Sequence, residues 1–231
     1  MMIAGFQTLS LLDYPGVISS IIFTQGCVFR CSYCHNPELI PHTAKSTTIT
    51  QEEILTKLRR HRNMVEGVCI TGGEPTIHPD LPELIRKLKQ ERFLVKLDTN
   101  GINPRMITRL IDEHLVDYVA MDLKHVWEKY DEVARSGSPR TPENCKRSFE
   151  VIQRSSIPHE FRTTAYAGLH TEEELIQIGA QLQHGERYAI QPIRYGVTFD
   201  SDLTALPSLN IERIVEKLGS LRPDLELIVR T

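Results

Sequence analysis

Residues 93–104, "FLVKLDTNGINP", contain a strand, a polar loop and the start of a helix. The run up to Thr99 is apolar and of strand length, and it ends in polar residues that suit a loop. Asn103 then precedes Pro104, which pairs a helix-capping side chain with the residue favoured at the first helical position. The stretch therefore predicts one strand–loop–helix unit.

The same order of elements recurs along the chain. Amphipathic segments of helical length lie between most of the apolar runs, and Thr50 with Glu53 and Thr171 with Glu174 have capping-box spacing. Strand–helix alternation predicts a parallel sheet with right-handed crossovers. The five further runs of strand length are "VISSIIFT" (17–24), "EGVCIT" (66–71), "VDYVAMDL" (116–123), "HEFRTTA" (159–165) and "RYAIQPI" (187–193).

Six such units are too few for a closed eight-stranded barrel. We therefore expect an α/β fold built as a partial, open (β/α)6 barrel, with a doubly wound open sheet as the alternative. The whole chain, residues 1–231, is expected to form a single domain. It would comprise an N-terminal strand and turn (1–16), a barrel core (17–200) and a C-terminal helix and strand (201–231).

The composition excludes several classes of partner. Hydrophobic residues make up 40% of the chain and charged residues 25%, as in ordinary globular domains. The net charge of −3 gives no reason to expect a nucleic-acid or membrane partner. No apolar run has the length of a membrane span, and the first residues lack the pattern of a signal peptide. We therefore expect a cytoplasmic protein with reduced thiols.

Three of the five cysteines lie together in residues 26–39, "GCVFRCSYCHNPEL". Cys27, Cys31 and Cys34 have C-x3-C-x2-C spacing, and such a cluster in a reducing compartment indicates metal binding or catalysis. An iron–sulfur cluster held entirely by protein normally uses four thiolates. Three thiolates would leave one iron open, as a catalytic zinc site keeps one position open.

Two non-catalytic interpretations of the cysteines stay open. A structural zinc site would need a fourth ligand, and His35 adjoins Cys34 too closely for an unstrained tetrahedral site. An iron–sulfur electron carrier would need a fourth thiolate. Cys69, in "EGVCIT", and Cys145, in "ENCKRSFE", are better interpreted as small buried hydrophobic residues.

The polar motifs fall at the predicted ends of strands. In barrel-like α/β folds the functional residues lie at the C-terminal ends of the strands. We therefore expect five segments to meet on one rim of the barrel. They are the cysteine loop, "GGEP" (72–75), "DTNG" (98–101), "MDLKH" (121–125) and "QPIR" (191–194).

Two of these motifs carry a family resemblance. "CVFRCSYC", with Tyr33 before the last cysteine, resembles the cysteine motif of the radical S-adenosylmethionine (radical SAM) enzymes, and "TGGEP" follows the second strand as in that superfamily. Within it, the chain is most similar to the glycyl-radical-enzyme activases, in particular those of anaerobic ribonucleoside-triphosphate reductase. The resemblance covers most of the chain. It rests further on "LLDYPG", "FTQGC", "YCHNPEL", "LDTNG", "MDLKH" and "FRTT" in that order.

The resemblance implies a cofactor pair and its ligands. Cys27, Cys31 and Cys34 would ligate a 4Fe–4S cluster, and the amino and carboxylate groups of S-adenosylmethionine (SAM) would chelate the fourth iron. The backbone of Gly72 and Gly73 would approach the methionine amino group, since glycine has no side chain.

Further pocket residues are assigned by the same resemblance. Glu74 would either join the SAM site or only brace its loop. Tyr33 and the backbone near His35 would contact adenine. Trp127 and Tyr130 could face a protein substrate, with packing over the barrel as the alternative.

The charged residues after the strands are also assigned by the resemblance. Asp98, Thr99 and Asp122 match positions that bind a monovalent cation beside the SAM carboxylate, and hard oxygen ligands suit such an ion. Ordinary strand-end caps are the alternative for Asp98 and Asp122, and structural salt bridges are the alternative for the four residues that follow. The ribose and carboxylate of SAM would be held by Asn100, Lys124, Arg162 and Arg194.

The implied reaction is radical generation. SAM would be cleaved reductively to methionine and a 5′-deoxyadenosyl radical, which would generate a glycyl radical on a partner enzyme, expected to be anaerobic ribonucleotide reductase. The electron would come from a flavodoxin- or ferredoxin-type donor. The alternative within the superfamily is a small-molecule enzyme similar to 7-carboxy-7-deazaguanine synthase.

Overall fold

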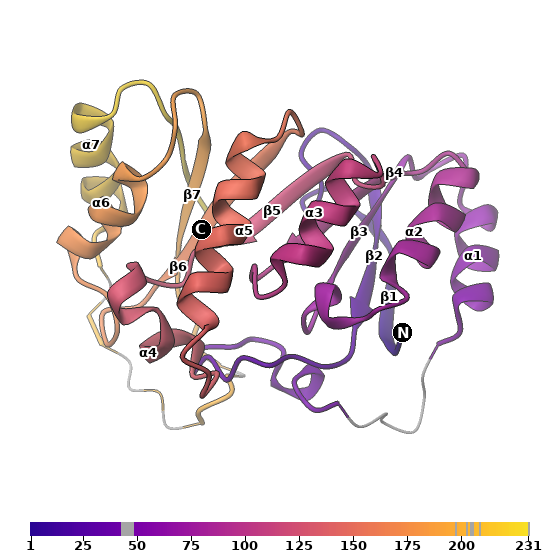
Figure 1. Cartoon of the computed structure of the whole chain (residues 1–231), viewed down its shortest axis with the longest axis horizontal. Helices are drawn as coiled ribbons and strands as arrows, with labels where there is room; N and C mark the ends of the chain where they lie inside the picture. The colour runs from indigo at the N-terminus through magenta and orange to yellow at the C-terminus, as the bar shows by residue number, and fades with distance from the viewer. Residues whose placement is uncertain (43–48, 197, 202, 204–205, 208, 231) are drawn as a thin grey trace.

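The computed structural model places all the strands in one eight-stranded sheet (Figure 1). The structure describes residues 1–42, 49–196, 198–201, 203, 206–207 and 209–230. The strands are β1 (Ile3–Ser10), β2 (Ser19–Thr24), β3 (Gly67–Gly72), β4 (Leu94–Thr99), β5 (Tyr118–Asp122), β6 (His159–Ala165), β7 (Arg187–Pro192) and β8 (Glu226–Val229).

The strand order decides between the two expected folds. The strands lie side by side in chain order from β1 to β8; β1 is antiparallel to β2, and every later neighbour is parallel. A doubly wound sheet would reverse its strand order at a switch point, and this sheet does not. The partial barrel is therefore confirmed. The six strands predicted for the core correspond to β2–β7, and the strands predicted within 1–16 and 201–231 are β1 and β8 at the two edges.

Helices cover the outer face of the sheet in Figure 1. Among the described residues no helix is long and apolar enough to cross a membrane. The α-helices are α1 (Gln51–Arg60), α2 (Leu81–Gln90), α3 (Pro104–Asp112), α4 (Tyr130–Ala134), α5 (Thr141–Arg154), α6 (Glu172–Ala180) and α7 (Ile211–Leu221). Three short 3-10 helices span Pro37–Leu39, Pro75–Ile77 and Trp127–Lys129.

Three of the helices, α1, α3 and α6, begin where the capping patterns predict. Thr50 and Thr171 each cap a helix in a complete capping box, and the Asn103 side chain accepts a hydrogen bond from the backbone of Met106. Each of these caps satisfies backbone N–H groups that the first helical turn leaves without a partner. These helix starts therefore follow from local sequence alone.

The alternation of side chains along each strand separates an apolar outer face from a polar inner face. In β4, Val95 and Leu97 are fully buried in the main core between sheet and helices. Lys96 and Asp98 alternate with them and point into the barrel, because successive strand residues face opposite sides. At the N-terminal ends of the strands, Tyr14 packs on Tyr118 with ring centroids 5.8 Å apart.

We predict that Leu97→Ala lowers the free energy of unfolding by about 3 kcal/mol, because it opens a cavity in a fully buried core. Leu94→Ala, on the same strand but 38% exposed, should cost less than about 1 kcal/mol. Urea unfolding followed by circular dichroism measures both. Equal losses at the two positions would contradict the assignment of β4's outer face to the core.

Candidate active site

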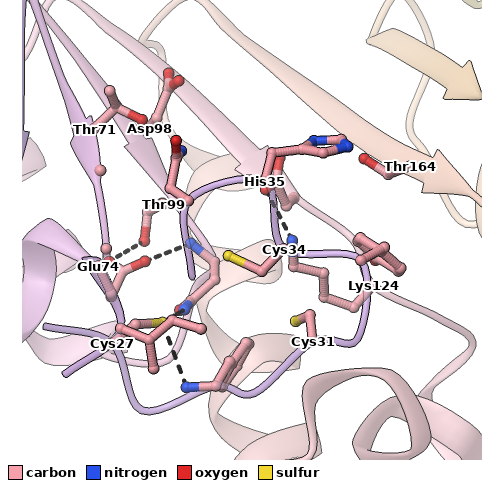
Figure 2. Close-up of a pocket in the computed structure, with 18 of the residues that line it drawn as sticks. Cys27, Cys31, Cys34, His35, Thr71, Glu74, Asp98, Thr99, Lys124 and Thr164 are labelled. Atoms are coloured by element: carbon pink, nitrogen blue, oxygen red, sulfur yellow. Dashed lines mark hydrogen bonds and ion pairs between the residues drawn. The ribbon is translucent and has the colours of Figure 1, made fainter. Parts of the chain in front are cut away.

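A pocket opens at the C-terminal ends of the strands, and it collects residues from β3–β7 and from the loop after β2 (Figure 2). Of the residues predicted for the site, all but Arg194 line it. Arg194 lies in a neighbouring small pocket with His35, Gln191 and Arg230, where His35 Nε2 is 2.9 Å from the Arg194 carbonyl oxygen. Sequence reasoning missed six lining residues: Phe29, Asn36, Ile40, Thr71, Thr164 and Gln191.

The cysteine loop is fixed by backbone hydrogen bonds at both ends. Gly26 N–H donates to the carbonyl of Leu39 at 2.7 Å and Cys27 N–H to that of Ile40 at 3.0 Å, which closes the loop on itself. Arg30 N–H donates to the carbonyl of Ala134 at the end of α4. All three thiols consequently line the same pocket, as Figure 2 shows.

The thiols are held in an environment that excludes water. Burial raises the pKa of Cys27 to about 12 and that of Cys31 to about 11, and it raises the pKa of Cys34 as well. Iron binds the thiolate, so cluster assembly must release protons from these groups. Among the described residues, no three Cys, His, Asp or Glu side chains are close enough to hold a single metal ion. Thiolates that bind separate irons of a cluster do not need to meet at one point.

The two glycines of "GGEP" are required by the chain around them. A Cβ on Gly72, whose φ is +114°, would lie 2.4 Å from the Thr24 backbone nitrogen, and one on Gly73 would lie 2.1 Å from the Gly26 carbonyl oxygen. Real Cβ atoms do not approach so closely, so both positions need glycine to pack against β2 and the cysteine loop. Gly73 thereby brings the end of β3 against the loop that carries Cys27.

Glu74 joins the ends of β3 and β4 beneath the pocket. Its side chain is 1% exposed, and Oε1 accepts hydrogen bonds from Thr76 N–H at 3.0 Å and from Thr99 Oγ1 at 2.7 Å. Oε2 accepts from Asn100 N–H at 2.7 Å, and Asn100 Nδ2 in turn lies 3.7 Å from Cys27 Sγ. These are the contacts of a brace, which was one of the two expected roles.

The inward-facing charges at the ends of β4–β6 form one partly buried network, in which Lys96 is buried and the Asp122 side chain is 32% exposed. Arg162 donates to Asp98 Oδ2 at 3.1 Å and to Asp122 Oδ1 at 2.8 Å, while Lys124 Nζ lies 3.0 Å from Asp122 Oδ2 and Lys96 pairs with Asp98 Oδ1. Burial alone would raise the pKa of both carboxyls, but the neighbouring cations hold each pKa below its usual range. Both carboxyl groups are therefore ionised at neutral pH.

Lys96 is the residue that sequence reasoning missed in this network. It is 1% exposed in the middle of an apolar strand, and lysine is almost never fully buried without a charged partner. A lysine between the apolar residues Val95 and Leu97 was the available signal. Asp98, two residues along the strand, faces the same side and supplies the partner.

The aromatic residues near the site divide into two groups. Tyr33 is buried in the pocket wall; its hydroxyl has no hydrogen-bond partner among the described residues, and its ring centroid lies 5.9 Å from Lys124 Nζ. Trp127 and Tyr130 instead stack on each other with centroids 5.2 Å apart. Tyr130 is fully buried and donates to the Asp122 carbonyl, so it packs in the core and cannot face a protein substrate.

The remaining two cysteines are buried, as expected. Cys145 Sγ lies 3.5 Å from the Asn100 carbonyl oxygen, and Cys69 Sγ lies 3.9 Å from Lys96 Nζ inside the barrel. Neither lines the pocket with the clustered thiols among the described residues.

We predict that Glu74→Gln lowers the free energy of unfolding by about 2 kcal/mol, since the new amide NH₂ must face a backbone or hydroxyl donor in a buried site. Glu38→Gln, at an exposed position in the segment that follows the three cysteines, should change the free energy of unfolding by less than about 0.5 kcal/mol. Urea unfolding compares them. If Glu74→Gln leaves the free energy of unfolding unchanged, the carboxylate does not brace the ends of β3 and β4.

Comparison with protein-family models matches residues 21–180 to the Radical SAM superfamily. A protein of Methanocaldococcus jannaschii named as a glycyl-radical enzyme activating enzyme is 31% identical over 223 residues, which cover 95% of this chain and 91% of the relative. The pyruvate formate-lyase-activating enzyme of Staphylococcus epidermidis is 28% identical over 80% of this chain and 78% of its own.

Two solved structures share the fold at low sequence identity. A radical SAM methyltransferase from Sphaerobacter thermophilus superposes with a TM-score of 0.68 at 18% identity, covering 96% of this chain and 68% of that protein. QueE from Escherichia coli superposes with a TM-score of 0.58 at 20% identity, covering 97% of this chain and 90% of that protein.

Proposed function

The chain belongs to the radical SAM superfamily and to its glycyl-radical activating enzymes, and we propose that its substrate is an anaerobic ribonucleoside-triphosphate reductase. The observation that carries the activity is the meeting of three thiols and a partly buried charge network in one pocket. The ordered segments "LLDYPG", "YCHNPEL" and "MDLKH" support the choice of partner. Pyruvate formate-lyase is the second candidate partner, because several relatives are named as its activating enzymes.

The residues of the pocket fit a 4Fe–4S cluster and SAM. Three thiols from one loop supply three cluster ligands, and an incomplete ligand set leaves one iron for a non-protein ligand. The buried Tyr33 hydroxyl, which has no partner among the described residues, offers a polar contact for a ligand in the pocket. We propose that Lys124 and Arg162 attract the SAM carboxylate and that Tyr33 and the backbone at His35 contact its adenine.

The cofactors supply the radical chemistry. With Cys27, Cys31 and Cys34 holding the cluster, the cluster and SAM would supply the one-electron chemistry that removes a hydrogen atom from the α-carbon of a partner glycine. The protein positions these groups and excludes water. We propose a flavodoxin- or ferredoxin-type electron donor and a cytoplasmic location, where thiols stay reduced.

We predict that the anaerobically reconstituted and reduced protein converts SAM to 5′-deoxyadenosine, and that Cys31→Ala abolishes this product. Cys145→Ala removes a buried thiol outside the cysteine loop and should retain both the brown cluster and the activity. Chromatography measures the 5′-deoxyadenosine formed by each variant, and iron analysis measures its cluster content. Bound zinc in place of iron, in colourless protein, would overturn the assignment.

The partner is tested by mixing the active protein with each candidate glycyl radical enzyme. We expect a glycyl radical signal by electron paramagnetic resonance with anaerobic ribonucleoside-triphosphate reductase and none with pyruvate formate-lyase. The opposite result would transfer the assignment to the second candidate. A signal with neither enzyme, together with SAM cleavage, would overturn both partners.

A further inference from the structure

Lys96 is a buried cation on the inner wall of the barrel. Its side chain is 2% exposed, pairs with Asp98 Oδ1 and lies 3.9 Å from Cys69 Sγ. Its ammonium is also 6.0 Å from the centroid of the Tyr118 ring. Asp98 lines the pocket, whereas Lys96 lies behind it, toward the interior of the barrel. Lys96 can therefore act on a bound ligand only through Asp98.

Every carboxylate oxygen at the expected cation site already has a cationic partner from the protein. Asp98 is bound by Lys96 and Arg162, and Asp122 by Arg162 and Lys124, one contact to each oxygen. The Thr99 hydroxyl donates to Glu74 and accepts from Gly101 N–H. A monovalent cation at these oxygens would lie beside the protein cations that already bind them and would be repelled, so this donor set does not fit such an ion.

The charge balance leads to the same conclusion. Lys96, Arg162 and Lys124 carry three positive charges against two on Asp98 and Asp122, which leaves an excess of one positive charge. The negative charge of the SAM carboxylate would balance the excess positive charge of these five side chains. An added metal cation would restore an uncompensated charge in a partly buried site, which is unfavourable.

We propose that Lys96 is a positioning residue that takes the place of a monovalent cation on Asp98, so that this enzyme binds SAM without potassium or sodium. The ammonium is tethered within the barrel and holds Asp98 against Arg162 in the absence of any ion from solution. The inference rests on the proposed SAM site, and it differs from the cation site that the family resemblance implied.

The test measures SAM affinity in the cluster-loaded, unreduced protein, so that no turnover and no partner are needed. Equilibrium dialysis is run in potassium chloride and in tetramethylammonium chloride at equal ionic strength. For the native chain we expect dissociation constants that agree within about twofold, because screening is matched and no ion site is filled. A tenfold or greater loss of affinity without potassium would overturn the proposal.

The substitution Lys96→Met should make SAM affinity depend on potassium, which would not happen if Lys96 only supported the fold. In tetramethylammonium its SAM affinity should fall about tenfold, the size expected for loss of one charge-assisted contact. Potassium should then restore most of the loss, because the vacated oxygen of Asp98 can accept an ion. Lys96→Arg should retain cation-independent binding, and Lys146→Met, on the exposed face of α5, should match the native chain.

The outcomes separate the inference from the proposed function. A Lys96→Met protein that loses affinity equally in both salts, with unchanged iron content and melting temperature, would show that Lys96 does no more than support the fold. If Lys96→Met fails to fold, the native chain and Lys96→Arg still decide the question by their dependence on potassium. A native protein that binds no SAM in either salt would overturn the proposed function, and this inference with it.

Discussion

The site depends on the ion pairs that the guanidinium of Arg162 forms with Asp98 and Asp122. The guanidinium bridges Asp98 on β4 and Asp122 on β5 from its own position on β6, so one side chain joins three neighbouring strands. Charges removed from water are tolerated only when they are paired and hydrogen-bonded. The pairing needs the exact register of these strands, with Asp98 beside Ala120 and Asp122 beside Arg162. Strand register and site chemistry therefore constrain each other.

Much of the architecture could be predicted because it is written in local patterns. Apolar runs, capping boxes and an Asn–Pro helix start are each short-range signals, and parallel strands bring their C-terminal ends to one edge. The position of the cysteine loop and of "GGEP" on one rim followed from these signals. The interior contacts did not, because a partner such as Asp122 for Arg162 lies 40 residues away and depends on register.

Two residues show where local reasoning stopped. The need for glycine at Gly73 comes from the carbonyl of Gly26, a neighbour only in space. The bracing contacts of Glu74 to Thr99 and Asn100 cross from one strand end to the next. The fold was therefore readable from local patterns and the cofactors were implied by the family resemblance, while these contacts depend on neighbours that only the folded chain brings together.

The position of the pocket, opposite the packed rings of Tyr14 and Tyr118, has a consequence for the order of events. These rings pack together at the N-terminal ends of the strands, with Val17 beside them, and the proposed SAM pocket opens at the opposite ends. Under the proposed function, a glycine-bearing segment of the partner would lie over the opening of that pocket. SAM would then have to bind before the partner, because the segment would cover it.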